Sequence, residues 1–436
     1  MTDSVPNTNP PEDLLYDYPT EPVPPEDRRG WLSLSFVTAG LAIAMSTLYT
    51  GATLATLLTF QDAIIAIICG SLFLLVMAGV MGGIGADRGV TFSVLARHAF
   101  GRSGSKIVGL IWAITLTGWY AYQSGFFGQT ISIIFPDGAL TQVSVATVWG
   151  GLLMMTTAIV GFKALAVLST IAAPIILFVC LWGAYKALVI GGFEAVSSVP
   201  AEPASIGLGI TIVIGGWIVG AIMQPDVSRY VTNRRANWIA CALAMVVFAI
   251  ALFSGMVMVK AAGTETIMEA MVGLGLGVMP LFIVILAQWT SNDNNLYSAS
   301  LGVTNICDIP KWKVAIFLGV VATLIAYFGV TGFFVPFLVF LGIFVPPIGG
   351  IIAVDYYLLG KREAYTFGPT TQYRQWNLVA IGTVVVAGLI SSQIQFGVGA
   401  FNSFVLGAAI YAAAMTVFAK LNISPYVGSE TLHGDG

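Results

Sequence analysis

Charged side chains are scarce in this chain. Of its 436 residues only 18 are Lys or Arg and 21 are Asp or Glu, which is 9%, against about 25% in an ordinary soluble domain. Hydrophobic residues make up 57%, and the mean hydropathy is +0.89. A soluble protein of this size cannot cover its surface with so few charges. The composition therefore excludes a cytosolic enzyme, a nucleic-acid binder and a disordered protein, and it leaves a multi-pass membrane protein.

Histidine and cysteine are also rare. The only histidines are His98 and His433, and neither lies in an apolar run. The four cysteines show no pairing pattern, so we expect free thiols. A membrane-embedded enzyme would need a nucleophile–base pair or a metal cluster, and neither is visible, so we expect no enzyme and no cofactor. The acidic, base-free first 27 residues do not resemble a secretory signal, and we expect 1–30 to be a disordered cytoplasmic tail.

Long apolar runs fill the rest of the chain. A membrane-spanning helix needs about 20 mainly apolar residues, and barrel strands of about 10 residues are much shorter than these runs. The sequence therefore predicts an all-α integral membrane fold with twelve transmembrane helices. The expected spans are roughly 32–58, 62–86, 106–135, 142–161, 164–189, 206–229, 237–260, 272–303, 312–330, 332–358, 377–396 and 399–420.

The placement of basic residues predicts the orientation. With the N-terminus inside and twelve spans, every Lys and Arg except Lys186 and Lys260 falls on the cytoplasmic side. The positive-inside rule describes this asymmetry. We therefore predict a multi-pass protein of the plasma (inner) membrane with both termini, including a tail at 421–436, in the cytoplasm.

Small residues interrupt two of the predicted spans. The first contains Gly40 to Thr47, and the sixth contains Gly215-Gly216-Trp217. Paired interruptions five helices apart indicate an inverted repeat with a site at the midplane, so we expect helices 1–5 in 31–189, helices 6–10 in 206–358 and two added helices in 377–420. Close helix packing is the alternative explanation for these glycines. Pro346-Pro347 in the tenth span indicates a hinge or a packing kink.

The eighth span carries the densest set of polar residues at membrane depth. The hydroxyls of Thr290 and Ser291 suit a hard cation such as sodium, and the amide of Asn292 suits a neutral heterocycle. Asp293 is the acid placed well inside this span, where it suits a cation or a proton. A polar network between helices is the alternative.

Two deep tryptophans add a stacking surface. Trp119 and Gln123 are four residues apart and share one helix face, and Trp217 follows the glycines of the sixth span. We expect a planar ligand to stack against one or two of these indoles while Gln123 and Asn292 contact its edge. The interfacial aromatic belt is the alternative, which suits Trp31, Trp238 and Trp376 better than these two.

Two further acids lie at the cytoplasmic ends of spans. Asp226 ends the sixth span and Asp355 ends the tenth. We expect both to make salt bridges or gate contacts rather than to bind substrate. The candidate partners are Arg97, Arg102 and Lys106.

Several spaced motifs together resemble one family. They are Trp289-Thr290-Ser291-Asn292-Asp293-Asn294 with Leu296-Tyr297, Pro346-Pro347-Ile348-Gly349-Gly350 with Asp355-Tyr356, Gly118-Trp119, and Leu95-Ala96-Arg97 with Phe100-Gly101. From about Arg28 to Lys420 the chain resembles the nucleobase–cation symporter family 1, the purine-cytosine permease family, and within it the cytosine permeases. The resemblance implies the 5+5 inverted-repeat fold of amino-acid, hydantoin and nucleobase transporters.

The resemblance also implies two sets of binding residues. By position, a sodium site would use the carbonyls of Gly40, Ile43 and Ala287 and the hydroxyls of Thr290 and Ser291. The family's substrate site maps onto Trp119, Gln123, Gly216, Trp217 and Asn292. The chain departs from the cytosine pattern at Leu116, Gly216, Trp217 and Val219, which favours a hydantoin- or allantoin-like pocket.

These features predict a secondary active transporter. We expect it to import a nucleobase or related planar heterocycle by sodium symport with alternating access. Proton coupling through Asp293 and a transporter-like sensor are the alternatives. The expected partners are a small heterocycle and the lipid bilayer, with no nucleic acid, and the oligomeric state is open.

Overall fold

The computed structural model describes residues 18, 21–160, 162–200, 202–304, 306–307, 309–359, 365–367 and 371–428. The predicted tails at 1–30 and 421–436 therefore lie partly outside the described residues. Lys361 and Arg362, two of the bases predicted to be cytoplasmic, lie wholly outside them. Nearly all of the described chain is helical, in agreement with the predicted all-α class.

The helices follow one another with short connections. In the first half they are η1 (Pro25–Asp27), α1 (Trp31–Ala42), α2 (Met45–Leu57), α3 (Phe60–Arg88), α4 (Phe92–Phe100), α5 (Arg102–Ile134), η2 (Ala139–Thr141), α6 (Val143–Val160) and α7 (Phe162–Val196). In the second half they are α8 (Ile206–Ile222), α9 (Gln224–Ser228), α10 (Arg234–Ala262), α11 (Ile267–Gly273), α12 (Met279–Ile283), the π-helix η3 (Val284–Gln288), α13 (Trp289–Thr304), α14 (Lys311–Tyr327), η4 (Val330–Phe333), α15 (Phe334–Phe344), α16 (Pro346–Ala353), the π-helix η5 (Val354–Leu358), α17 (Leu378–Gln393) and α18 (Gly399–Lys420). β1 (Trp376–Asn377) and β2 (Tyr426–Val427) pair as a short antiparallel sheet, with α17 and α18 between them in the chain.

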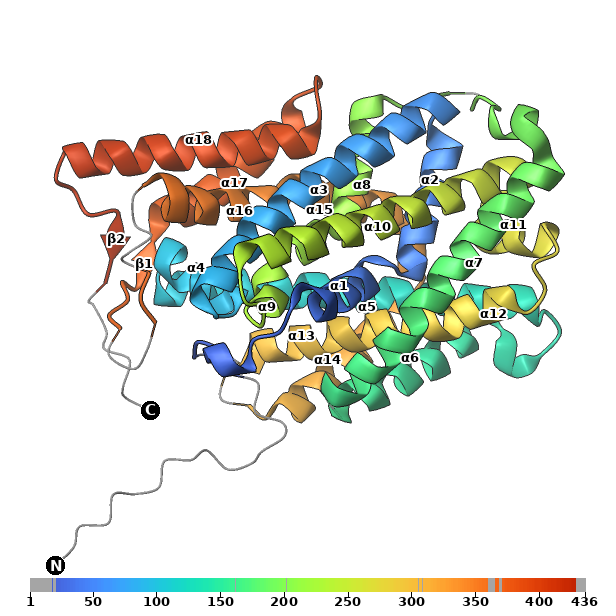
Figure 1. Ribbon diagram of the computed structural model, residues 1–436, viewed down its shortest axis with the longest axis horizontal. Coiled ribbons are helices and arrows are strands. Elements are labelled where there is room, and N and C mark those ends of the chain that lie inside the picture. The colour runs from blue at the N-terminus through green and yellow to red at the C-terminus, as the bar shows by residue number, and fades with distance from the viewer. Residues whose placement is uncertain are drawn as a thin grey trace, which may run out of the picture.

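The long helices pack as two groups. In one group α1, α2, α3, α8 and α10 contact one another, and in the other α5, α6, α13 and α14 do so. Figure 1 shows α3 and α10 running together, with α13, α14 and α6 along the opposite side. The groups meet where α1 and α2 approach α13, η3 and α5. This seam holds the buried polar residues described below.

The first predicted span is broken as expected. α1 and α2 are bent by 53°, and Ile43 and Ala44 between them have extended backbone conformations. The tenth predicted span is also divided, since α15 ends at Phe344 and α16 begins at Pro346, where proline removes a backbone donor. Irregular backbone at membrane depth is tolerated where it lines a protein-enclosed space.

The predicted interruption of the sixth span is wrong. α8 is continuous through Gly215 and Gly216 and ends only at Ile222. A Cβ on Gly215 would lie 1.9 Å from the carbonyl oxygen of Leu338 on α15. The glycine is therefore present because two backbones approach closely there, which is the packing explanation.

The predicted eighth span also differs from the structure. It begins at Met279 instead of residue 272, since Gly275 and Gly277 both have a φ of 64° and form a turn. Its irregular part is the π-helix η3, which the sequence pattern did not reveal. Short π-helical segments inside α-helices occur frequently at functional sites.

Judged by length and composition, six helical segments of the described chain are long and apolar enough to cross a membrane. They are Phe60–Arg88, Pro174–Val196, Ile206–Ser228, Arg234–Ala262, Val330–Leu358 and Gly399–Lys420, and the bent pair α1 and α2 makes a seventh. The structure thus supports a helical membrane protein, while the count of twelve spans stays a prediction. Figure 1 places α4 and the β1–β2 sheet at one end of the bundle and α11 and α12 at the other.

Candidate functional site

Side-chain amides connect α5 to η3 and α13 in the seam. The Nε2 of Gln288 donates to the backbone oxygen of Gln123 at 3.1 Å. The Nδ2 of Asn292 donates to the hydroxyl of Ser124 at 3.2 Å. All four side chains are buried, with exposures of 2% or less. The structure therefore brings the predicted Gln123 and Asn292 to one helix–helix contact.

Several polar atoms of this contact lack a hydrogen-bond partner among the described residues. They are the Oε1 atoms of Gln123 and Gln288, the Oδ1 of Asn292 and the Oγ of Ser291. Buried polar atoms are almost always paired, so each exception calls for an explanation. Gln288 and Asn292 use their N–H groups within the protein, and all three amides leave their oxygens unused. A ligand that supplies N–H donors would satisfy these oxygens.

The two predicted stacking residues occupy different surroundings. Trp119 is packed edge-to-face against Phe337 of α15, with ring centroids 5.3 Å apart. The indole N–H of Trp217 donates to the backbone oxygen of Leu41 at 3.2 Å, which ties α8 to the break after α1. Both indoles are buried rather than interfacial. Next to Trp217, a Cβ on Gly216 would meet Thr50 at an ordinary distance of 3.6 Å, so this position has room beside the seam.

The break between α1 and α2 exposes backbone oxygens. The last carbonyls of a helix have no intrahelical donor, and here Leu41 accepts from Trp217 while Ala42 accepts from the Thr47 hydroxyl at 3.0 Å. Among the described residues no hydrogen bond reaches the oxygens of Gly40 and Ile43. These are the two carbonyls of the break that the family resemblance assigns to sodium.

The remaining predicted sodium ligands lie on η3 and α13. The hydroxyl of Thr290 donates to the backbone oxygens of Leu286 at 2.9 Å and Ala287 at 3.2 Å, which leaves its oxygen lone pairs available. The Oγ of Ser291 has no partner among the described residues. α1 contacts α13 and α2 contacts η3. The donor set, neutral oxygens only, fits a hard monovalent cation.

Asp293 points to a different neighbour from Asn292. Its Oδ1 accepts a hydrogen bond from the Thr157 hydroxyl of α6 at 2.6 Å, and Thr157 in turn accepts from the indole N–H of Trp289 at 2.7 Å. Its Oδ2 has no partner among the described residues. Asp293 therefore belongs to an α6–α13 contact next to the seam.

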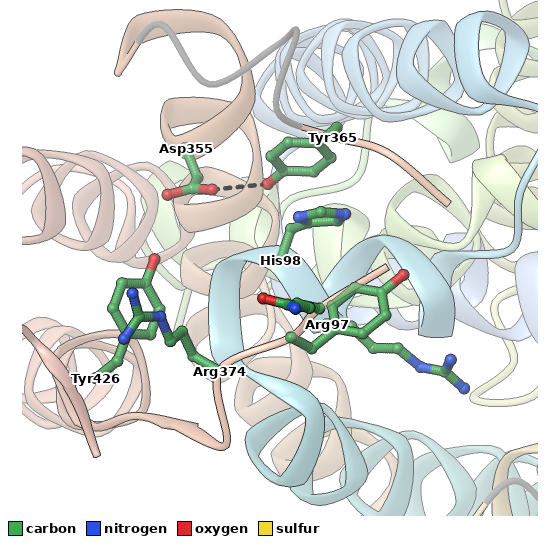
Figure 2. A pocket seen from close by; sticks show the side chains of 8 residues that line it. Arg97, His98, Asp355, Tyr365, Arg374 and Tyr426 are labelled. Carbon is green, nitrogen blue, oxygen red and sulfur yellow. Dashed lines mark hydrogen bonds between the residues drawn. The ribbon is translucent and has the colours of Figure 1, made fainter. Parts of the chain in front are cut away.

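A cavity of about 180 Å³ lies at the end of the bundle where α4, η5 and the β1–β2 sheet meet (Figure 2). In its wall the carboxylate of Asp355 accepts hydrogen bonds from the hydroxyls of Tyr365 at 2.8 Å and Tyr411 at 2.7 Å. His98 stacks on Tyr365 with ring centroids 4.3 Å apart. Burial raises the pKa of Tyr365, and the Asp355 charge raises it further. Asp355 thus fastens η5 to neighbouring segments through tyrosine hydroxyls, whereas the sequence predicts salt bridges or gate contacts with basic residues.

The other acids at this end make similar contacts. Asp226 accepts the backbone N–H of Phe92 at 2.6 Å. An ion pair joins Arg234 of α10 to Asp87 of α3, and the Tyr356 hydroxyl donates to the same Asp87 at 2.9 Å. Asp87 was not singled out from the sequence, because nothing in the order of residues links it to Arg234.

Gln288 is the main site residue that the sequence analysis did not assign. It begins the polar run of the eighth span and lies four positions before Asn292. That spacing puts two amides on one helix face, and it was a signal that the sequence offered. Ser124 carried no such signal, because its role depends on which helix packs against α5.

Comparison with solved structures identifies the fold. The chain shares its fold with the inward-facing conformation of Mhp1, with a TM-score of 0.78 at 20% sequence identity over 93% of this chain and 95% of that one. This likeness establishes the fold of the chain.

Comparison of sequences gives the family. Residues 22–420 match the family model described as a permease for cytosine/purines, uracil, thiamine and allantoin, and the chain belongs to this family. The cytosine permease of Escherichia coli (strain K12) is 32% identical over 400 residues, which cover 89% of this chain and 92% of the relative. The hydantoin permease of Microbacterium maritypicum is 23% identical over 83% of this chain and 81% of the relative. The resemblance to the nucleobase–cation symporter family is confirmed.

Proposed function

We propose that the protein imports a planar, N–H-bearing heterocycle of the nucleobase or hydantoin class, coupled to sodium. The observation that carries the proposal is the group of unpartnered acceptors in the seam, Gln123 Oε1, Gln288 Oε1 and Asn292 Oδ1. Nucleobases and hydantoins present N–H groups along the edge of a flat ring. The family membership and the names of the relatives support the same ligand class.

In this proposal Trp119 and Trp217 contact the faces of the ring, and Gly216 leaves space beside it. Sodium is held by the carbonyls of Gly40, Ile43 and Ala287 and by the hydroxyls of Thr290 and Ser291. The carbonyls of Gly40 and Ile43 come from the broken helix of one group, whereas the carbonyl of Ala287 and the two hydroxyls come from η3 and α13 on the other side of the seam. Bound sodium and substrate would therefore hold the two groups together, and their release on the other side would complete alternating access.

The proposal is tested in two steps. Thermal shifts of the purified protein with cytosine, adenine, uracil, allantoin and hydantoin identify the ligand, because a compound that binds only the folded state raises its stability. Uptake of the labelled ligand into proteoliposomes is then measured with and without an inward sodium gradient. We expect uptake that the gradient stimulates and that Trp119→Ala abolishes. Binding without uptake would indicate a sensor and refute the transport proposal.

Proton coupling is the second candidate because of one observation. Asp293 is fully buried and its Oδ2 has no partner among the described residues, which is an arrangement suited to a proton. In the same proteoliposomes, uptake that a proton gradient drives in the absence of sodium would favour this candidate over sodium coupling.

A further inference from the structure

Basic side chains gather in a second cavity, of about 110 Å³, that lies beside α4. Ser93 and Arg97 line it from α4, and Arg102, Ser105 and Lys106 line it from the first turns of α5. Its remaining wall includes Gly302 of α13. No carboxylate lines this pocket in the part of the chain that the structure describes. Three cations and two hydroxyls thus surround one small space.

The local electrostatics favour an anion in this pocket. Arg102 and Lys106 lie in the first turns of α5, where the helix dipole disfavours positive charge. Burial lowers the pKa of the Arg97 guanidinium, which the nearby Tyr373 opposes and the charge of Arg102 reinforces. An anion between the three cations would relieve their mutual repulsion.

Such an anion would meet side chains rather than backbone amides. The first N–H groups of α5 already donate to the chain before β1, from Arg102 to the oxygen of Arg374 at 2.8 Å and from Ser103 to the oxygen of Gln375 at 2.9 Å. The guanidinium of Arg102, the ammonium of Lys106 and the hydroxyl of Ser93 are the groups of the pocket that match the oxygens of a phosphate.

The surface next to the pocket is apolar. Directly after the exposed Lys106, α5 presents the exposed side chains Ile107, Leu110, Ile111 and Ile114. This spacing forms one stripe along the helix. In a membrane transporter such a stripe faces lipid chains, so the basic pocket lies at the head of a lipid-facing surface.

We propose that the pocket binds the phosphate group of an anionic phospholipid whose chains lie along the α5 stripe. Basic pockets between transmembrane helices bind such head groups. The inference does not depend on the transported ligand or the coupling ion. A purely topological role for these bases would need their charge on this side of the membrane, but it would need no shared cavity and no adjoining stripe.

The test is a titration of the delipidated, purified full chain followed by native mass spectrometry. The probes are phosphatidylglycerol, phosphatidylcholine and inorganic phosphate. The pocket variant is Arg102→Gln/Lys106→Gln. The matched control is Lys313→Gln/Lys420→Gln, which removes two exposed basic side chains outside the pocket. If the pocket variant does not fold, Lys106→Glu at a single exposed position replaces it.

We expect wild type to bind phosphatidylglycerol more tightly than phosphatidylcholine. Loss of two basic residues should weaken phosphatidylglycerol binding about 30-fold, while the control double variant behaves as wild type. Equal weakening in the pocket and control variants would overturn the proposal. Binding of inorganic phosphate without a preference for phosphatidylglycerol would overturn the lipid as the source of the phosphate.

Discussion

Gln123→Met tests whether the unpartnered amide oxygens serve a ligand. Gln123 is 2% exposed and its Oε1 has no partner among the described residues. Methionine has a similar length and no strong acceptor. The hydrogen bond from Gln288 is retained, because it ends on the backbone oxygen of Gln123. The substitution therefore removes the side-chain amide with its unpartnered oxygen and keeps this contact with Gln288.

The expected effects on stability and on binding have opposite signs. A buried polar atom without a partner costs about 1–3 kcal/mol, so its removal should raise the melting temperature of the ligand-free protein. In the bound state the same substitution leaves a ligand N–H unpaired at a similar cost. That cost corresponds to a dissociation constant about 5- to 150-fold higher.

Differential scanning fluorimetry gives the first quantity, and calorimetric titration with the most stabilising compound of the heterocycle panel gives the second. Gln129→Met on the same helix is the control, since the amide of Gln129 donates to the Thr331 hydroxyl at 2.9 Å. The control should lose stability and keep its affinity. If Gln123→Met instead lowers the melting temperature and leaves affinity unchanged, its amide is a structural group and the reasoning fails.

Three further predictions follow from the same geometry. Ser291→Ala should raise the sodium concentration needed for half-maximal uptake about tenfold, since one cation ligand is lost, without changing heterocycle binding at saturating sodium. Gly215→Ala should lower the free energy of unfolding by at least the cost of overpacking, about 1–3 kcal/mol, and so lower the melting temperature, because its Cβ would meet the Leu338 oxygen at 1.9 Å. Gly216→Ala should fold normally. Asp293→Asn should leave uptake dependent on sodium, and loss of all ion dependence would instead assign coupling to Asp293.

The sequence predicts the parts of the structure that depend on local chemistry. The length of the apolar runs predicts the helices, and the small residues around Gly40 predict the break between α1 and α2. The same signal fails at Gly215, because glycine permits both an interrupted helix and a close backbone contact. Only the neighbouring Leu338, more than 100 positions away, distinguishes the two.

The polar site is predictable in its residues but not in its pairing. Polar groups at membrane depth are costly, and this marks Gln123 and Asn292 in the sequence. Which of their atoms are used within the protein depends on the helices that meet. The Asn292 N–H donates to Ser124, and its oxygen is left without a partner, because α13 packs against α5 at this register.

The unused atoms have one chemical character, and this restricts what fills the seam. Amide oxygens of Gln123 and Asn292, the hydroxyl of Ser291 and the carbonyls of Gly40 and Ile43 all accept hydrogen bonds or bind cations. An anionic substrate would meet mainly lone pairs there, with the Ser291 hydroxyl as the one donor of this set, and would be repelled. A cation at the carbonyls and a neutral ring that donates N–H groups satisfy them together. In the proposed binding mode each ligand contacts both helix groups, so that either one would favour the arrangement of the groups that binds the other, which is a physical basis for coupled binding.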